Sequence, residues 1–192
     1  MSFYFKPFPK VRYSQKKNNN FELLTNITLR YKIKELVKER KAIYYDYIVK
    51  DSDRPDIIAF KYYDDESLDW VLLIVNDIVD PYYDWPLSQQ AFDSYMKSLY
   101  GSTSSAKTTV YEYRKILSNQ SVRSDGSVIP KRTVVVDLNT YNSLVATNRE
   151  IIYAYDFHLE QNDAKRRIKI LDKRFINQLK RDVEVIFSEL DE

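Results

Sequence analysis

The sequence predicts an α+β fold, in which short strands and amphipathic helices follow one another without a regular βαβ alternation. Two observations carry this prediction. Apolar residues recur at helical spacing over 174–190, whereas residues 132–138 contain a run of valines that is typical of a strand. With 192 residues, of which 44% are hydrophobic and 30% charged, the chain is long and apolar enough to bury a core.

The N-terminal part, 1–43, is predicted to be an arm followed by two short elements. Residues 3–13 read FYFKPFPKVRY, and aromatic and basic residues around two prolines indicate an extended arm. The polar run 14–20 is then a loop, and the alternation over 27–33 predicts a strand. Apolar residues among charges over 34–43 are typical of a short helix.

The central part, 44–101, begins with a predicted strand. Residues 44–49 read YYDYIV, a β-branched and aromatic run. A first helix is expected over 54–63, with Asp53 as its N-cap and Pro55 in its first turn, where the missing N–H costs nothing. Its buried side would hold Ile57, Ile58, Phe60 and Tyr62.

A second helix is expected over 67–76, which contains the most apolar run of the chain and should be buried on more than one face. Residues 80–86, DPYYDWP, follow it directly as an aromatic turn between two prolines. This turn is unusual, because loops are normally polar. A third helix is expected over 86–100, with Gly101 placed to end it.

The segment 102–148 is predicted to be a β-rich insertion. Small polar residues over 102–108 indicate a loop, and strands are expected over 109–117 and 132–138. The Ser-Asp-Gly-Ser sequence of 124–127 marks a turn between them.

The C-terminal part, 149–192, is expected to complete the core. Alternating runs over 150–159 and 166–171 predict a hairpin or a strand–turn–strand, and an amphipathic helix follows over 174–190. The apolar stripe of this helix consists of Phe175, Ile176, Leu179, Val183, Ile186, Phe187 and Leu190.

Composition excludes several kinds of chemistry. The chain has no Cys, which excludes disulfides, thiol catalysis and Cys-ligated zinc. The single histidine, His158, has Asp156 nearby but no nucleophile, so a structural role is favoured over a catalytic one. The acids between Asp64 and Asp69 lack a calcium-loop pattern and are better explained as helix caps than as a cation site. We therefore expect no enzyme activity, no catalytic residues, no cofactor and no metal.

Charge and hydropathy narrow the class of partner. The formal net charge is only +2, so no global field predicts nucleic-acid binding, and the basic runs 38–41 and 165–169 are favoured as solvated faces or protein contacts. The apolar run 70–75 is too short to span a bilayer, and residues 1–9 do not resemble a signal peptide. We expect a protein kept in a cytosol-like compartment that binds no nucleic acid, no membrane and no small-molecule substrate.

Aromatic residues make up 15% of the chain, with 17 tyrosines, and there are only two glycines. Tyr offers a large contact area at low entropic cost and is enriched at interfaces. Two interpretations of the aromatic turn therefore stay open: its rings cover the preceding helix as a lid, or they contact a partner. The candidate partner-binding residues are Phe3, Tyr4, Phe5, Phe8, Tyr82, Tyr83 and Trp85.

The predicted order of a strand, two helices and a return strand resembles the lysin-motif (LysM) β-α-α-β module. Ile48-Val-Lys-Asp-Ser-Asp53 stands where that family has V-K-x-G-D-[TS], and Ser52 replaces the glycine that helps to shape the family's sugar groove. This replacement argues against glycan binding. The residues assigned to the structural motif are Asp53, Arg54, Pro55, Trp70, Asn76, Asp80 and Pro81.

A larger set of residues resembles the small baseplate wedge subunit of T-even-type contractile-tailed phages, which has a LysM-like core. The set is Tyr45-x-Tyr-x-Val49, Asp53-Arg-Pro55, Trp70-Val-Leu-Leu73, Asn76, the run 80–88 (DPYYDWPLS) and the run 162–171 (NDAKRRIKIL). The resemblance implies a LysM-like core with an N-terminal arm, an inserted segment 102–148 and a C-terminal helix. It also implies a structural role in the virion tail baseplate, assembled in the host cytoplasm. Such subunits clamp neighbouring wedge subunits into a closed ring around the hub, so other wedge and hub-proximal tail proteins are the expected partners.

Two other functions stay open at this stage. The LysM pattern alone would fit a peptidoglycan- or glycan-binding module. A tail-associated hydrolase is the third hypothesis, although the sequence nominates no convincing acid for it.

Overall fold

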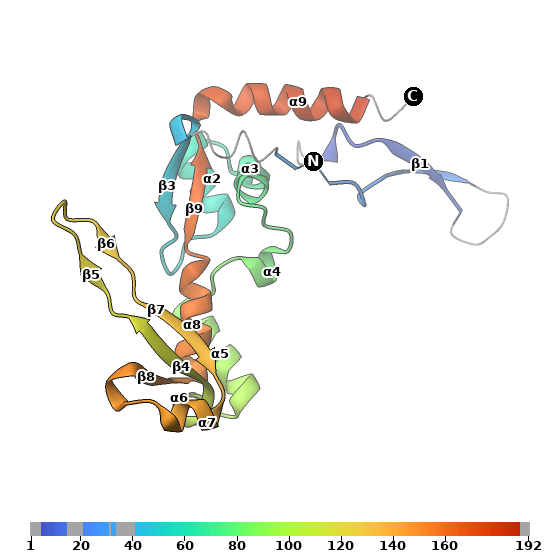
Figure 1. The fold of residues 1–192 in the computed structure, drawn as a ribbon. Coiled ribbons are helices and arrows are strands. Elements are labelled where there is room, and N and C mark those ends of the chain that lie inside the picture. The colour runs from blue at the N-terminus through green and yellow to red at the C-terminus, as the bar shows by residue number, and fades with distance from the viewer. Residues whose placement is uncertain (1–4, 15–20, 31, 34–40, 189–192) are drawn as a thin grey trace. The chain divides into compact units, whose positions relative to one another are not determined.

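The computed structural model describes residues 5–14, 21–30, 32–33 and 41–188 (Figure 1). It divides the chain into two units. Unit 1 comprises residues 1–86 and 165–192, and unit 2 comprises residues 87–164. The sequence-based expectation placed the inserted segment at 102–148, but the inserted unit begins earlier and ends later. Helices and strands are mixed in both units, in agreement with the α+β class.

Unit 1 is organised around two strands that lie far apart in the sequence. Strand β3 (Tyr44–Ile48) pairs antiparallel with β9 (Arg167–Leu171), with Tyr44 opposite Leu171. The strand expected at 44–49 is therefore confirmed. Along β9, Ile168 and Ile170 are buried while Lys169 between them is exposed, so one face of the pair packs on the core.

Two helices of unit 1 follow β3 directly in the sequence: α2 (Pro55–Tyr63) and, after the 3₁₀ turn η3 (Glu66–Leu68), α3 (Asp69–Val75). Both predicted helices are thus confirmed. Most of α3 is covered, as its apolar run requires. The side chains that these helices bury are Ile58, Ala59, Tyr63, Trp70, Val71, Leu72 and Val75.

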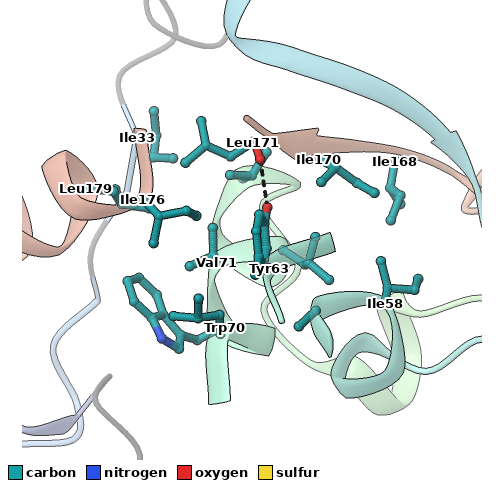
Figure 2. Close-up of a cluster of buried hydrophobic side chains, with 14 of the residues drawn as sticks. Ile33, Ile58, Tyr63, Trp70, Val71, Ile168, Ile170, Leu171, Ile176 and Leu179 are labelled. Carbon is teal, nitrogen blue, oxygen red and sulfur yellow. Dashed lines mark hydrogen bonds between the residues drawn. The ribbon is translucent and has the colours of Figure 1, made fainter. Parts of the chain in front are cut away.

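The C-terminal helix α9 (Ile176–Ser188) completes this core after the 3₁₀ turn η5 (Lys173–Phe175), which confirms the helix expected over 174–190. Figure 2 shows Ile176 and Leu179 beside Val71, with the ring of Trp70 below them. The buried hydroxyl of Tyr63 donates to the carbonyl oxygen of Leu171 at 3.0 Å, which ties α2 to the end of β9 (Figure 2). Each fully buried side chain of this kind contributes about 1.5–3 kcal/mol relative to exposure.

Asn76 connects α3 to β9. Its side-chain nitrogen donates to the carbonyl oxygens of Leu72 and Lys169, both at 2.8 Å. Its side-chain oxygen accepts from the backbone N–H of Lys169 at 2.7 Å. The amide therefore satisfies both polar groups of one β9 residue, as a neighbouring strand would, while it also closes the end of α3.

The prediction of a strand at 27–33 is wrong. The N-terminal part contains a hairpin instead. Strands β1 (Lys10–Tyr13) and β2 (Glu22–Thr25) pair antiparallel. The side chain of Asn26 accepts from the N–H and hydroxyl of Thr28, which turns the chain where the strand was expected to begin. Most of the helix expected over 34–43 falls on residues 34–40, which lie outside the described residues. The remaining three residues form the 3₁₀ turn η2 (Lys41–Ile43).

Unit 2 contains a three-stranded sheet of order β7-β4-β8. Its strands are β4 (Val110–Ser118), β7 (Arg132–Val136) and β8 (Arg149–Tyr153), so the strands expected at 109–117 and 132–138 are confirmed. The short strands β5 (Ser121–Val122) and β6 (Val128–Ile129) continue β4 and β7 as a hairpin (Figure 1). The predicted turn at 124–127 closes it, with Gly126 at φ 80°.

Four helices accompany this sheet: α5 (Gln89–Tyr100), α6 (Thr103–Thr108), α7 (Leu138–Ser143) and α8 (Ala154–Ala164). The helix expected over 86–100 is confirmed, and Gly101 ends it at φ 78°. Phe92, Met96 and Ala106 form the buried centre of the unit. Asn162, buried on α8, accepts from the N–H of Leu87 at 2.7 Å and donates to its carbonyl oxygen at 3.1 Å.

Two sequence-based expectations for unit 2 are wrong. Residues 102–108 are mainly a helix, because Ser102 caps it by accepting from the N–H of Ser105 at 3.0 Å. The hairpin of 150–159 with 166–171 does not form. Instead β8 pairs with β4, and helix α8 follows β8 directly.

The expected cap and buried side of α2 also need correction. Arg54 holds the N-cap position, and Asp53 accepts instead from the hydroxyl of Tyr47 at 2.5 Å, the N–H of Lys50 at 3.1 Å and Nζ of Lys61 at 3.0 Å. Of the four apolar residues expected to be buried, only Ile58 is; Ile57, Phe60 and Tyr62 are exposed, because the helix packs through Ile58, Ala59 and Tyr63.

Replacing Asn76 with Ala should lower the free energy of unfolding by about 1–3 kcal/mol, because the substitution leaves the backbone groups of Lys169 without the amide. Denaturant titration of the purified chain measures this change. Asn119→Ala, in an exposed loop of unit 2, is the control and should change stability little. Equal stability of N76A and the wild type would contradict the assigned link.

Asp53→Asn should also destabilise the protein, and the loss should depend on pH. Burial opposes ionisation, but the hydrogen bonds from Tyr47, Lys61 and Lys50 outweigh it and hold the pKa of the Asp53 carboxyl below its usual value. The stabilisation is therefore present above the unfolded pKa of about 3.9 and disappears as the pH falls through the lower folded value.

The difference in unfolding free energy between wild type and D53N should thus be constant near neutral pH and shrink in strong acid. Urea titrations across the acidic range measure it. Asp46→Asn, at an exposed position of β3, is the matched control. A D53N deficit that stays the same throughout the acidic range would contradict the assignment.

Candidate functional site

The aromatic turn is a single helical turn, α4 (Pro81–Asp84), and not an irregular loop. Asp80 caps it, since its side chain accepts from the N–H of Tyr82 at 2.9 Å. Pro81 occupies the first helical position, where its fixed φ suits a helix start. The Asp80–Pro81 pair of the sequence therefore specifies where this turn begins.

A second carboxylate closes the same turn from its other end. Asp84 accepts from the backbone N–H groups of Val79 and Asp80, both at 3.1 Å. These two hydrogen bonds hold the pKa of the Asp84 carboxyl below its usual value. Lys165, where the chain returns to unit 1, donates to the carbonyl oxygen of Tyr83. The backbone of the turn is thus held at several points by its own unit.

The three aromatic rings of the turn point to different environments. Trp85 is 9% exposed and belongs to the core of unit 1, where its Nε1 donates to the backbone carbonyl of Asp53 at 3.1 Å. Tyr82 and Tyr83 are 89% and 77% exposed. Both interpretations of the turn therefore apply to different residues: Trp85 covers the core, and the tyrosine pair remains outside.

An exposed tyrosine pair on a backbone held in this way is suited to binding a partner. Tyrosine rings provide apolar contact area with a polar tip, and a backbone that is already ordered loses little entropy when it docks. The carboxylates of the turn, Asp80 and Asp84, accept hydrogen bonds from its own backbone N–H groups, so they hold the turn in shape.

The remaining candidate contact residues lie in the N-terminal arm. Phe3 and Tyr4 lie outside the described residues. Phe5 is half-exposed, but Phe8 is 4% exposed and its ring centroid lies 4.4 Å from that of Phe187 on α9. The expectation that Phe8 contacts a partner is therefore corrected: this chain's own core covers it.

Sequence reasoning missed a groove of about 380 Å³ in unit 1. Phe5, Ile27 and Val79 are exposed residues on its wall, and Leu73 and Ile78 line it as well. These residues come from three separate parts of the sequence, so no local pattern could have brought them together. The groove adjoins the turn in sequence, since Val79 immediately precedes Asp80.

Several residues assigned to the structural motif make contacts that hold the fold of unit 1. Asp53 and Asn76 hold the bonds described above, and Trp70 is buried in the core. Arg54 forms an exposed ion pair with Asp56 at 2.9 Å. An exposed ion pair of this kind adds little stability, so the contribution of Arg54 to the fold is limited to its N-cap position.

The single histidine lies in unit 2, on helix α8 and not on the expected strand. The hydroxyl of Tyr100 lies 3.1 Å from Nε2 of His158, and the rings of Tyr95, Tyr111 and Phe157 pack around it. Burial lowers the pKa of His158. This is the environment of a packed structural histidine, as the sequence favoured.

The acid cluster also has a structural explanation. Asp65 caps η3 by accepting from the N–H of Ser67 at 2.9 Å, and Asp64 forms an ion pair with Lys173. Burial raises the pKa of Asp69. Within residues 5–14, 21–30, 32–33 and 41–188, no group of three or more His, Asp or Glu side chains is placed to hold a metal ion.

The two basic runs have different outcomes. The run 38–41 cannot be placed, because its side chains fall outside the described residues. In the run 165–169, Arg166 donates to the carbonyl oxygen of Val49 at 3.3 Å and lies 3.6 Å from Asp51. Part of this run therefore joins the chain's return into unit 1 to the end of β3. None of the helices in the described part of the chain is both long and apolar enough to cross a membrane.

Comparison with known proteins agrees with this picture of a contact protein. The family described as base plate wedge protein 53 matches residues 3–125. A curated relative, the baseplate wedge protein gp53 of Enterobacteria phage T4, is 49% identical over 45 residues, which are 23% of this chain and 23% of that relative. The aligned stretch thus spans less than a quarter of the relative's length. Because the family match covers more than half of the 192 residues, the chain belongs to the base plate wedge protein 53 family, a family of structural proteins of the phage tail base plate.

Proposed function

We propose that this chain holds neighbouring wedge subunits together, so that the wedges close into a ring around the central hub of the base plate. The observation that carries the proposal is the α4 turn, where two tyrosines are almost fully exposed on a backbone held by Asp80, Asp84 and Lys165. Its partners are other wedge and hub-proximal proteins, which join it during assembly in the host cytoplasm.

The chemistry of the turn supports a protein partner. Tyrosine is among the residues that dominate binding energy at protein interfaces, and a close pair of tyrosines can form the centre of a contact. Phe5 and Val79 line the groove and add apolar surface to the same unit. We assign this groove, together with Phe3 and Tyr4, to the contact made by the tyrosine pair. Trp85 supports the turn from inside and touches no partner.

We further propose that unit 1 is a LysM-like core adapted to protein contacts. The order β3–α2–α3–β9, with an antiparallel β3–β9 pair, supports the comparison with a β-α-α-β module. Unit 2 is then an insertion between the second helix and the return strand. Ser52, in place of the glycine of the LysM motif, supports a use other than sugar binding.

The same strand and helix order also favours a second candidate, a module that binds peptidoglycan. The two functions separate in a sedimentation experiment with purified peptidoglycan. We expect the chain to stay in the supernatant, with a known LysM protein as positive control. Sedimentation of the wild-type chain with peptidoglycan would favour the second candidate.

Replacing Tyr82 and Tyr83 together with Ala should impair base plate assembly and leave the fold intact, because both rings are largely exposed and contribute little to the core. The expected result is a free energy of unfolding within about 0.5 kcal/mol of wild type. At the same time, far fewer complete base plates should form when the variant complements a phage that lacks the wild-type chain. Counting tails in electron micrographs measures assembly.

Two variants control this experiment. Phe60→Ala removes an exposed aromatic ring from α2 of the same unit and should assemble normally. Trp85→Ala should instead destabilise the chain by about 3–5 kcal/mol, since it empties a buried site. Normal assembly by a folded Y82A/Y83A variant would remove the tyrosine pair from the proposed contact.

A further inference from the structure

Unit 2 carries a second surface with different chemistry, a two-stranded ribbon that projects from its sheet (Figure 1). We define the ribbon as residues 115–135, which include the end of β4, the β5–β6 hairpin and most of β7. The α4 turn belongs to unit 1, so the ribbon is not part of the surface described above.

The ribbon exposes apolar side chains on both of its faces. Val134 and Val135 are neighbours on β7 and therefore point to opposite faces, yet they are 47% and 61% exposed. Val122 and Val128, which face each other across the hairpin, are exposed as well. An isolated two-stranded ribbon is marginally stable in water, so this element lacks the cover that strands normally have.

One backbone edge of the ribbon is also open. In the order β7-β4-β8, β7 is an outer strand, and β4 is its one neighbour among the described strands. The outward N–H and C=O groups of an edge strand are a template for a further strand. Natural proteins protect such edges, and here the exposed valines leave the edge of β7 suited to pairing.

The charge of the ribbon indicates the chemistry of its partner. Residues 115–135 contain four basic side chains and one acid, Asp125. Asp125 accepts from the N–H and hydroxyl of Ser127, so it is used within the turn. Lys131 is paired with Glu150. The remaining basic side chains, which have no ion pair in the described structure, are Lys115, Arg123 and Arg132.

We propose that the open edge of β7 binds an extended, acidic segment of a neighbouring base plate protein, which adds a strand to the sheet of unit 2. Backbone hydrogen bonds along β7 would give affinity, and the basic side chains beside it would select a segment rich in Asp and Glu. A second copy of the ribbon would bring like charges together, and a nucleic acid would leave the valines without an apolar partner. The inference rests on the proposed role in the base plate, because that role supplies the partner.

Site-specific photocrosslinking in assembled phage tests this inference. The photoreactive residue p-benzoylphenylalanine is placed at Val135, with Val122 as a second ribbon position. Val145 is the control, since it is exposed in unit 2 but lies outside the ribbon. The expected result is a crosslink from both ribbon positions to one acidic segment of a base plate protein, identified by mass spectrometry, and no such crosslink from Val145.

Charge reversal provides the second arm of the test. Arg123→Glu combined with Arg132→Glu should reduce the crosslink yield roughly tenfold or more, because like charges then oppose the acidic segment. Lys97→Glu, on the exposed side of α5, should leave the yield unchanged. Circular dichroism of each purified variant shows that the fold is retained.

The outcomes separate this inference from the proposed function. Particles that contain the chain but give no ribbon crosslink would overturn the strand addition and leave the wedge role standing. A crosslink to a second copy or to nucleic acid, or one that survives the double charge reversal, would overturn it as well. Absence of the chain from purified particles would overturn both proposals.

Discussion

The antiparallel pairing of β3 with β9 is the constraint on which unit 1 depends. These strands are separated by more than a hundred residues, and the whole of unit 2 lies between them in the sequence. Closing so long a segment has an entropic cost, although it grows only slowly with length. Several specific bonds at the strand ends accompany the ladder, including the Tyr63 hydroxyl to Leu171 and the Asn76 amide to Lys169. No short loop joins β3 to β9, so these hydrogen bonds help to fix the register of β9 instead.

The two exposed tyrosines of the α4 turn also depend on specific hydrogen bonds for their position. Tyr82 and Tyr83 gain nothing from the core, so their positions depend on the backbone around them. Asp80 and Asp84 accept from backbone N–H groups at the N-terminal end of the α4 turn, and Lys165, where the chain returns from unit 2, donates to the carbonyl oxygen of Tyr83. The turn is thus held by local bonds and by one bond from the C-terminal half of unit 1. The bond from Lys165 links the position of the proposed contact surface to the fold of the C-terminal half of unit 1.

Periodicity predicted the elements whose side chains face one environment consistently. Helix α9 and strands β4 and β7 were predictable on this basis, and so was the strand–helix–helix order after residue 44. The run 154–164 was not, because its apolar residues fit neither period clearly and tertiary packing against α5 and α6 decides its state. For the candidate site, the sequence singled out the turn 80–86, where the structure exposes Tyr82 and Tyr83 and buries Trp85. Which ring points inward depends on the bond from Trp85 to Asp53, a contact across 32 positions that no local pattern contains.

The central claim is that Tyr82 and Tyr83 are exposed in the free chain and covered by a neighbour in the base plate. Hydroxyl-radical footprinting with mass spectrometry measures this directly, by comparing oxidation of each ring in the purified chain and in isolated base plates. Both rings should be oxidised rapidly in the free chain and protected in the assembly, while buried Trp85 should react slowly in both states. Equal oxidation of the two tyrosines before and after assembly would contradict the account.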